Sequence, residues 1–388
     1  MSRSTTSRSA LPRTDARRRL AGLASRLLLT VLLSTLSLVA ASGAALAEAG
    51  RVYTATNAAE GNEIVVYSRN EGGLLTFESR ISTGGLGTGG GLGNQGGLAI
   101  SEDDQWLLAV NAGSDSVSVF AITEEGLELT SLARTRGDLP VSVALSGRTA
   151  YVLNAGSDDV VGFRLDHRGR LWRLPASRRH LSGEGTGGAQ VGFSADGRRL
   201  IVTEKATSRI DVFEVRFGGY LSRGQFVAAS GETPFGFGFG RRGQLFVSQA
   251  AGGAAGASTL GAYRVVGRDD LLAITGAVPT LNSAACWVVV SIDQRTAWTT
   301  NTGSGTISGF RIESDGSVAL IETDGISATL VEGSSPIDMG LTDDGRYLYV
   351  LSGGSNSITG YRVEAEGSLV EVEFVDGLPA GVNGLIAR

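Results

Sequence analysis

The stretch LAVNAGSDSVSVF, residues 108–120, is the repeating unit that decides the fold. It reads as a strand that ends at Asn111, a turn of small and polar residues, and a second strand with Phe120 near its end. Copies of its first half end at Asn57, Asn111, Asn154, Glu204, Gln249, Asn301 and Ser352. The aromatic residues of its second half stay in register at Tyr67, Phe120, Phe163, Phe213, Tyr263, Phe310 and Tyr361.

Seven copies at spacings of 43 to 54 residues, built from short strands and Gly-rich turns, are typical of the blades of a β-propeller. Short runs of small or β-branched residues precede six of the copies and are predicted to be inner strands, where bulky side chains do not fit. These runs are residues 96–101, 141–146, 189–194, 235–240, 287–292 and 337–342. Outer strands are predicted after the aromatic strands, for example at residues 74–81, 127–134 and 369–376.

The seventh inner strand is missing from this series and is predicted at the far end of the chain. Residues 384–387, GLIA, resemble residues 97–100, GLAI, and no second strand follows them. We therefore predict that the C-terminus supplies the inner strand of the first blade and closes the ring, which leaves no sheet edge unpaired. The predicted fold is an all-β, seven-bladed propeller of four-stranded antiparallel blades over residues 48–388.

Residues 1–47 are predicted to be a secretory signal peptide that is cleaved. Residues 1–26 carry seven arginines and one acid, an apolar run follows, and Ala45-Leu46-Ala47 has the small-x-small pattern of a cleavage site. A retained anchor is the alternative, since residues 27–47 are just long enough to span a bilayer. The arginine triplet at residues 17–19 leaves open the twin-arginine route besides the general secretory route. We expect the mature protein to be secreted or periplasmic.

Charge and cysteine content exclude several classes of function. Without residues 1–47 the chain loses seven of its 34 basic and one of its 39 acidic residues, so the net charge changes from −5 to −11. This net charge gives no electrostatic case for binding nucleic acid or anionic membranes, and no stable membrane insertion is expected after cleavage. The single cysteine, Cys286, excludes an internal disulfide. We expect a monomer whose partner is a small-molecule substrate, a glycan or a peptide.

The repeat, in which AVN or YVLN precedes the turn, resembles the seven-bladed β-propeller lactonase family, which includes bacterial 6-phosphogluconolactonase and the carboxymuconate-lactonising enzymes. The resemblance covers essentially all of residues 48–388. It implies a site at the mouth of the central channel, with an adjacent Arg-His pair at the start of one inner strand and a glutamate from a turn of the same blade. The matching pairs read Ala189-Gln190 and Cys286-Trp287, and the glutamate position is Lys205 or Thr302. The family's mechanism therefore does not carry over to this chain.

Other polar residues are predicted at the channel mouth, and Glu204, Lys205 and Asp338 are the catalytic candidates. Lys205 is the only lysine of the chain, and a lysine can lose its proton on burial or stabilise an oxyanion, whereas arginine stays charged. Glu204 and Asp338 could activate water, or bind calcium, which is the one cofactor that the sequence leaves open. The predicted substrate-binding residues are Ser142, Gln190, Trp287, Asn111, Asn154, Gln249 and Asn301.

Each of these residues also has a structural alternative. Asparagine beside Gly or Ser caps backbone N–H groups in turns, and Glu204 and Lys205 could be ordinary surface residues. The glycine-rich residues 84–97 and 183–190 enter inner strands on the mouth face, where they form either a mobile rim or plain connections. No helix follows the G-x-G-x-x-G string that begins at Gly85, so a dinucleotide site is not predicted.

The remaining sequence signals narrow the chemistry. The two histidines, His167 and His180, are predicted at the periphery, where they cannot serve as a general base in the channel. The chain has no G-x-S-x-G motif of a serine hydrolase. Three classes of function remain: a secreted lactone hydrolase or lactonising enzyme, a non-catalytic binder of a saccharide, peptide or cell-envelope component, and a structural element of a surface assembly.

Overall fold

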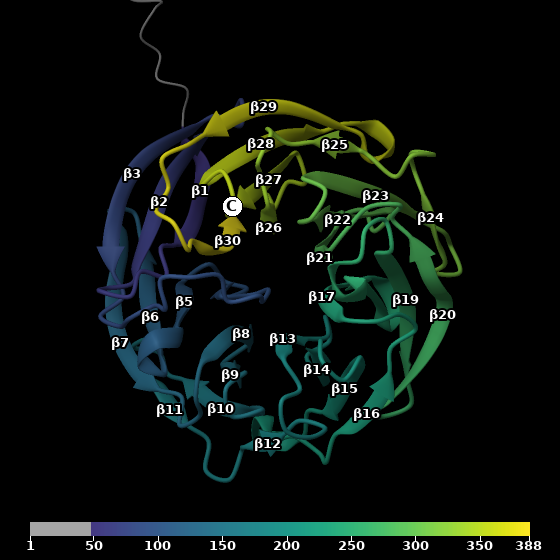
Figure 1. Ribbon diagram of the computed structural model, residues 1–388. Coiled ribbons are helices and arrows are strands. Elements are labelled where there is room, and N and C mark those ends of the chain that lie inside the picture. The colour runs from purple at the N-terminus through teal and green to yellow at the C-terminus, as the bar shows by residue number, and fades with distance from the viewer. Residues whose placement is uncertain (1–47) are drawn as a thin grey trace, which may run out of the picture. The chain divides into compact units, whose positions relative to one another are not determined.

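Seven antiparallel sheets stand around a common axis in the computed structural model, which describes residues 48–388 (Figure 1). The predicted seven-bladed propeller is thereby confirmed. The predicted signal peptide, residues 1–47, lies outside the described residues, which form one compact unit, Glu48–Arg388. Within that unit, no helix has the length and apolar character needed to cross a bilayer.

The first four blades each extend from an inner strand at the axis to an outer strand at the rim. From the axis outward, blade 1 contains β30 (Asn383–Ala387), β1 (Glu48–Ala55), β2 (Glu63–Asn70) and β3 (Leu75–Ser82). Blade 2 contains β4 (Leu98–Ile100), β5 (Trp106–Asn111), β6 (Ser116–Thr123) and β7 (Gly126–Arg134). Blade 3 contains β8 (Pro140–Ser146), β9 (Thr149–Asn154), β10 (Asp159–Leu165) and a divided outer strand, β11 (Leu171–Arg173) and β12 (Arg179–His180). Blade 4 contains β13 (Gly188–Phe193), β14 (Arg199–Glu204), β15 (Arg209–Glu214) and β16 (Gln225–Ala228).

The other three blades follow the same plan. Blade 5 contains β17 (Pro234–Phe239), β18 (Gln244–Gln249), β19 (Thr259–Val266) and β20 (Asp270–Pro279). Blade 6 contains β21 (Ala285–Val290), β22 (Thr296–Asn301), β23 (Thr306–Ile312) and a divided outer strand, β24 (Val318–Leu320) and β25 (Ala328–Thr329). Blade 7 contains β26 (Pro336–Leu341), β27 (Tyr347–Ser352), β28 (Ser357–Val363) and β29 (Leu369–Val375). Short 3₁₀ turns occur at η1 (Ala112–Ser114), η2 (Phe217–Gly219), η3 (Arg241–Gly243), η4 (Ala251–Gly253) and η5 (Ala365–Gly367).

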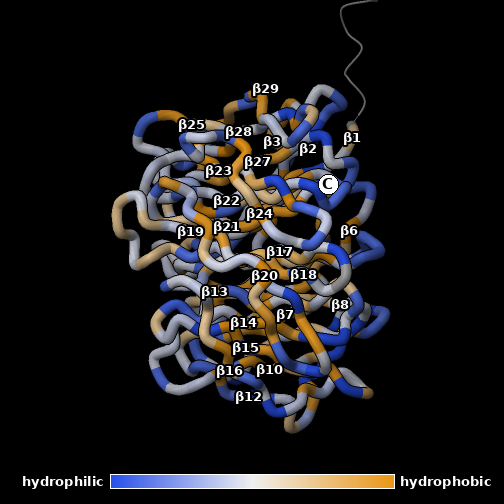
Figure 2. The backbone as a smooth tube through the Cα atoms, turned by 90° about the vertical axis from the view of Figure 1, so that its right-hand side faces the viewer, coloured by the Kyte–Doolittle hydropathy of each residue, from blue (hydrophilic) through white to orange (hydrophobic). Residues whose placement is uncertain are grey.

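The hydrophobic core lies between the faces of neighbouring blades. The second strands are buried along most of their length because sheets pack against both of their faces, and every residue of β9 is buried. The repeated aromatic residues Phe120, Phe163 and Phe213 are buried within these inter-blade clusters. Burial of each such ring contributes about 1.5–3 kcal/mol. Figure 2 shows the result as hydrophobic strands bordered by hydrophilic turns.

The C-terminal strand closes the ring, as predicted. β30 pairs antiparallel with β1, with Val52 opposite Ala387. The Arg388 carbonyl accepts a hydrogen bond from Arg69 Nε at 3.0 Å, and the Arg388 guanidinium forms ion pairs with Asp104 and Asp343. The last residues of the chain therefore join blade 1 to blades 2 and 7.

Deletion of residues 381–388 is expected to destabilise the whole molecule, because it removes the inner strand of blade 1 and exposes β1 and both neighbouring blades. We expect the unfolding midpoint to fall by roughly 10 °C or more, as measured by circular dichroism. A chain that is extended by a few polar residues after Arg388 keeps β30 and serves as the control. An unchanged midpoint in the truncated chain would show that the ring does not depend on this closure.

Candidate functional site

Six of the seven inner strands, all except β4, begin with a β-bulge or a register irregularity at the channel mouth. In β8, β13 and β26 the register shifts by one residue just after the pairs Pro140–Asn154, Gly188–Glu204 and Pro336–Ser352. In each pair the second residue is the last residue of the second strand of its blade. The bulges therefore lie at the end of the propeller where the sequence predicts the site. A bulge changes the direction of a side chain, so the residues that follow it are free to point toward the next blade.

Three predicted site residues occupy these bulges, and each contacts the backbone of a neighbouring blade. Ser142 Oγ accepts a hydrogen bond from the Val191 N–H at 3.1 Å. Gln190 accepts from the Phe237 N–H at 2.6 Å and donates to the Phe237 carbonyl at 3.2 Å. Asp338 Oδ2 accepts from the Leu385 N–H at 3.1 Å. Ser142, Gln190 and Asp338 therefore connect blade 3 to 4, blade 4 to 5 and blade 7 to 1.

Residues 84–97, which we call the plug, form neither a free rim nor a plain connection. This segment runs from β3 to β4, and Figure 1 shows it as a blue loop that extends toward the centre of the ring. Asn94 exchanges hydrogen bonds with Asn383 of β30, at 2.6 and 3.3 Å, and also donates to the Val141 carbonyl of β8. The Gln95 N–H donates to the Ala189 carbonyl of β13 at 3.1 Å.

The side chain of Gln95 fixes the plug to the far side of the channel. It accepts a hydrogen bond from the Val288 N–H at 3.2 Å and donates to the Val288 carbonyl at 3.3 Å, on β21 of blade 6. Its amide oxygen lies where a Cβ of Gly236 would be, so only glycine leaves room for it. Because Gln95 joins blades 4 and 6 beside blade 5, the plug lies across the channel mouth.

Lys205 lies against the plug, in the turn after β14. Its Nζ donates a hydrogen bond to the Gly93 carbonyl and is 4.9 Å from the centre of the Phe235 ring. Burial lowers the pKa of the Lys205 amine below its ordinary value. The neighbouring Cys286 thiol has its pKa raised to about 11 by burial, so it carries no charge at neutral pH. The only lysine of the chain thus lies half-buried, beside an aromatic ring and an uncharged thiol.

Trp287 connects this lysine to Asp338. The Trp287 ring packs against the Phe235 ring at a centroid distance of 5.2 Å. On its other side the indole N–H lies near Asp338 without a hydrogen bond to it. Burial raises the pKa of the Asp338 carboxyl well above its ordinary value, against the effect of the Met339 and Leu385 N–H groups. Lys205 and Asp338 therefore belong to one row of side chains across blades 4 to 7, although they do not touch.

Glu204 does not join that row. Its side chain is fully buried and accepts hydrogen bonds from the Ser182 N–H at 2.8 Å, from Ser182 Oγ at 2.5 Å and from Thr207 Oγ1. The neighbouring ionisable group is Asp211, whose pKa is raised to about 10 by burial and by the charge of Glu204. Asp211 is thus protonated at neutral pH. The predicted pairing of Glu204 with Asp338 for water activation is therefore wrong in its geometry.

The other predicted binding residues are buried inside their own blades. Each donates a hydrogen bond of 2.8 Å to a partner in the same blade: Asn111 to Ser118 Oγ, Asn301 to Ser308 Oγ, Asn154 to Asp159 Oδ1 and Gln249 to Tyr263 Oη. These four side chains have no exposed surface, so their contacts are those of the structural alternative. His167 and His180 are exposed on the outer part of blade 3.

No group of three or more His, Cys, Asp or Glu side chains comes together as a metal-binding cluster within residues 48–388. The two carboxylates considered for calcium are on different blades, 4 and 7, and each accepts hydrogen bonds from protein groups. The described part of the chain therefore offers Glu204 and Asp338 no shared ligand position. The row from Lys205 to Asp338 is the candidate site.

Sequence reasoning missed Gln95, Phe235 and Asp211. Gln95 had a detectable signal, because Asn94 and Gln95 are the only amide residues in an otherwise glycine-rich run, and Gly236 interrupts a run of phenylalanines. Asp211 occupies in blade 4 the place that Ser118 has in blade 2, two residues beyond the first residue paired with the strand end. Glu204 is the one glutamate among the residues that end the second strands. The aspartate at position 211 of the next strand was therefore a sequence signal that two carboxyl groups are buried together in blade 4.

These features define a seven-bladed β-propeller whose channel mouth is covered by its own glycine-rich segment. Residues 61–178 match the family model of the 7-bladed beta-propeller lactonases, which confirms the resemblance to that family over those residues. Among functionally curated proteins, none matches this sequence.

Solved structures share the fold. A periplasmic gluconolactonase from Pseudomonas aeruginosa is 18% identical with a TM-score of 0.66, and the match covers 86% of this chain and 98% of that one. A protein from Lactobacillus plantarum is 17% identical with a TM-score of 0.72, covering 87% and 99%. A candidate 6-phosphogluconolactonase from Bacteroides fragilis is 19% identical with a TM-score of 0.70, covering 89% and 100%. At these identities the likeness establishes the fold alone.

The variant Gln95→Ala is expected to release the plug, because it removes both side-chain hydrogen bonds to Val288. Thermolysin should then cut within residues 84–97 about tenfold faster, the factor that corresponds to roughly 1.4 kcal/mol for two hydrogen bonds. Cleavage is followed by mass spectrometry. The control is Gln105→Ala, at an exposed glutamine of blade 2. Equal cleavage of wild type and Gln95→Ala would show that Gln95 does not hold the plug.

The variant Asp211→Asn is expected to become more stable relative to wild type as the pH rises. Folded wild type keeps the Asp211 proton up to a pKa of about 10, whereas the unfolded chain loses it near 3.8. Wild-type stability therefore falls across this window, by up to about 1.4 kcal/mol per pH unit, and asparagine does not titrate.

The measurement is the difference in unfolding midpoint between Asp211→Asn and wild type at pH 5, 7 and 9. Asp196→Asn is the matched control. Partial burial raises the pKa of this carboxyl, but a hydrogen bond from Ser194, the Arg198 N–H and the arginine charges outweigh that effect, so the pKa is lowered overall. A difference for Asp211→Asn that stays constant with pH would contradict a protonated Asp211.

Proposed function

We propose that the protein opens or closes a lactone ring at the channel mouth, with Lys205 at the reacting centre. The observation that carries this proposal is the position of the only lysine, whose amine has a lowered pKa and lies against Phe235 and the plug. The match of residues 61–178 to the lactonase model supports the same class of reaction. Export through residues 1–47 belongs to the proposal, and it places the substrate outside the cytoplasm.

Lys205 can move the proton that the hydrolysis of a lactone requires. Its neutral amine takes a proton from water, and the water oxygen bonds to the lactone carbonyl carbon. The acyl C–O bond then breaks, and the ring oxygen leaves with the proton that Lys205 has received. The product is a hydroxy acid, and the reverse sequence forms the lactone. A lowered pKa is what this role needs, because an amine with its ordinary pKa stays protonated at neutral pH.

The neighbouring residues have positioning roles in this proposal. Phe235 and Trp287 form an apolar wall beside the amine, and Asp338 holds β26 to β30 through its bond to the Leu385 N–H. Glu204 fixes the turn that carries Lys205, through its bonds to Ser182 and Thr207. The substrate reaches Lys205 when the plug moves, because the Gly93 carbonyl holds the amine in the closed form.

The plug itself favours a second candidate function. It is hydrogen-bonded to inner strands of blades 1, 3, 4 and 6. A channel mouth that is covered in this way suits a propeller that binds a saccharide, a peptide or a cell-envelope component without catalysis, by an outer surface. The two candidates differ in whether Lys205 performs chemistry.

Hydrolysis of a panel of γ- and δ-lactones tests the first candidate. The variant Lys205→Ala should lose 10²-fold or more in kcat/KM, the usual contribution of a general base. Wild-type activity should rise with pH through a pKa below 10.5, the ordinary value of lysine, and Lys205→Arg should lack this rise.

Glu184→Gln, at an exposed residue in the glycine-rich segment before β13, is the control that keeps wild-type activity. If folded wild type turns over none of the lactones, the lactonase proposal fails for these substrates and the non-catalytic binder replaces it. If Lys205→Ala is as active as wild type, lactone chemistry takes place at another site.

A further inference from the structure

The net charge conceals a strongly basic segment. Residues 164–223 contain eleven arginines and Lys205 against six acids, so this stretch of blades 3 and 4 has a net charge of +6. The other residues of 48–388 contain 15 basic and 32 acidic side chains, with a net charge of −17. Electrostatic attraction depends on local potential, so the overall charge of the domain says little about what this segment binds.

A rigid hairpin in this segment exposes an aromatic side chain. Residues 215–224 join β15 to β16, and within them Val215 and Leu221 form an antiparallel bridge. Phe217, at the tip of this hairpin, is 102% exposed. The hairpin is held in place by blade 3: Arg164 donates to the Gly218 carbonyl and Tyr151 Oη to the Gly219 carbonyl, both at 2.9 Å. The turn that carries Phe217 is thus fixed by hydrogen bonds, and it leaves the whole aromatic ring exposed to water, which is unfavourable for an apolar side chain.

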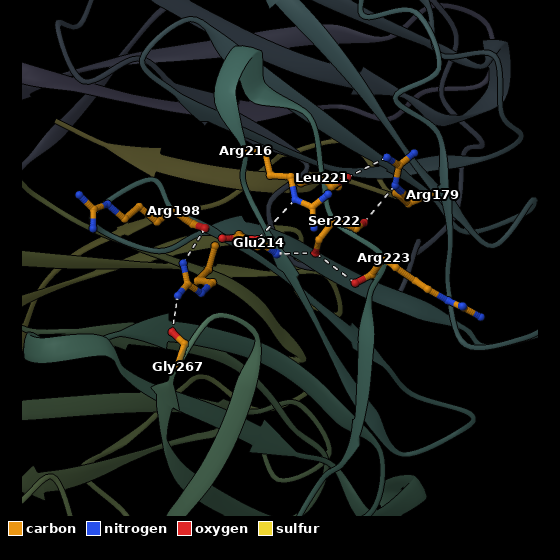
Figure 3. A network of polar contacts seen from close by, with 9 residues as sticks. Arg179, Arg198, Glu214, Arg216, Leu221, Ser222, Arg223 and Gly267 are labelled. Carbon is orange, nitrogen blue, oxygen red and sulfur yellow. Dashed lines mark hydrogen bonds and ion pairs between the residues drawn. The ribbon is translucent and has the colours of Figure 1, made fainter.

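Several arginines contact or adjoin this hairpin. Arg179 donates to the carbonyls of Leu221 at 2.7 Å and Ser222 at 3.0 Å (Figure 3). The Arg198 carbonyl accepts a hydrogen bond from the Val215 N–H at 2.8 Å. In Figure 3 the guanidinium groups of Arg198 and Arg223 extend away from the network. The side chain of Arg216, next to the phenylalanine, forms a long, largely exposed ion pair with Glu214 at 3.4 Å.

This basic surface lies at the opposite end of blade 4 from the candidate site. The hairpin adjoins the turn between β13 and β14, which contains Arg198. Lys205 follows the other end of β14. A partner that covers the hairpin therefore leaves the channel mouth open to the surroundings.

We propose that the surface formed by Arg198, Arg216, Phe217 and Arg223 binds an anionic phospholipid bilayer. The phenylalanine enters the boundary between headgroups and acyl chains, and the arginines pair with lipid phosphates. A bilayer suits these residues better than a polysaccharide, because the most exposed ring belongs to phenylalanine, which has no polar edge to hydrogen-bond a sugar. The protein thereby attaches to the membrane by its basic face, with its channel mouth directed away from the lipid.

Sedimentation of residues 48–388 with lipid vesicles tests the proposal. The protein should bind vesicles of phosphatidylcholine mixed with phosphatidylglycerol, should not bind phosphatidylcholine alone, and should dissociate at high salt. Phe217→Ser and the double variant Arg198→Gln/Arg223→Gln should each weaken binding about tenfold. Phe374→Ser is the matched control, because Phe374 is an exposed phenylalanine of blade 7 that follows the acidic residue Glu373.

A tryptophan at position 217 gives a second readout, because its fluorescence reports whether the ring enters the lipid and does not depend on how tightly the protein binds. Phe217→Trp should shift its emission to shorter wavelength with the mixed vesicles, since the ring enters an apolar layer. Absence of binding to the mixed vesicles would overturn the proposal, as would binding that both surface variants leave unchanged. Tighter binding to heparin than to the mixed vesicles would assign the surface to an anionic polysaccharide instead.

Discussion

The contacts between neighbouring inner strands at the channel mouth are the constraint on which the rest of this structure depends. Side chains beside each bulge connect one blade to the next: Ser142 reaches β13, Gln190 reaches β17, and Asp338 reaches β30. Thr302 of blade 6 donates to the Pro336 carbonyl of blade 7 at 2.7 Å. Asn94 joins blades 1 and 3 at the start of blade 2. Blade 5 has Gly236 at its bulge, and Gln95 of the plug supplies the missing side chain.

This use of the bulge residues decides what remains for chemistry. A side chain that holds two blades together by buried hydrogen bonds is costly to release, so Ser142, Gln190 and Asp338 are committed to the ring. Lys205 is different, because its contacts are to the Gly93 carbonyl of the plug and to the Phe235 ring. The same plug that completes the junction at blade 5 thus also covers the one amine with altered acidity. Stability of the ring and access to the candidate site are physically linked through Gln95.

The repeat in the sequence was sufficient for the fold because each blade has the same period, the same strand-end residue and the same buried aromatic position. The sequence showed six inner strands for seven repeats, so residues 384–387 were predicted to supply the seventh and to close the ring. The site was less accessible, since a bulge shifts the alternation of side chains by one residue and reverses the face that each one occupies. Glu204 is on β14, which has no bulge of its own, and it points into blade 4 toward Asp211, as Asn111 points toward Ser118 in blade 2. Contacts such as Gln95 to Val288 join residues 193 positions apart and leave no local pattern.

Covalent labelling of Lys205 tests the central claim, which is that the plug keeps this amine desolvated and its pKa low. Because the chain has a single lysine, acylation by an amine-reactive ester is read from one peptide by mass spectrometry. The account predicts slow labelling that follows a pKa below 10.5 in wild type, and faster labelling that follows a pKa closer to 10.5 in Gln95→Ala. Labelling of wild type at the rate and with the pKa of a free lysine side chain would contradict it.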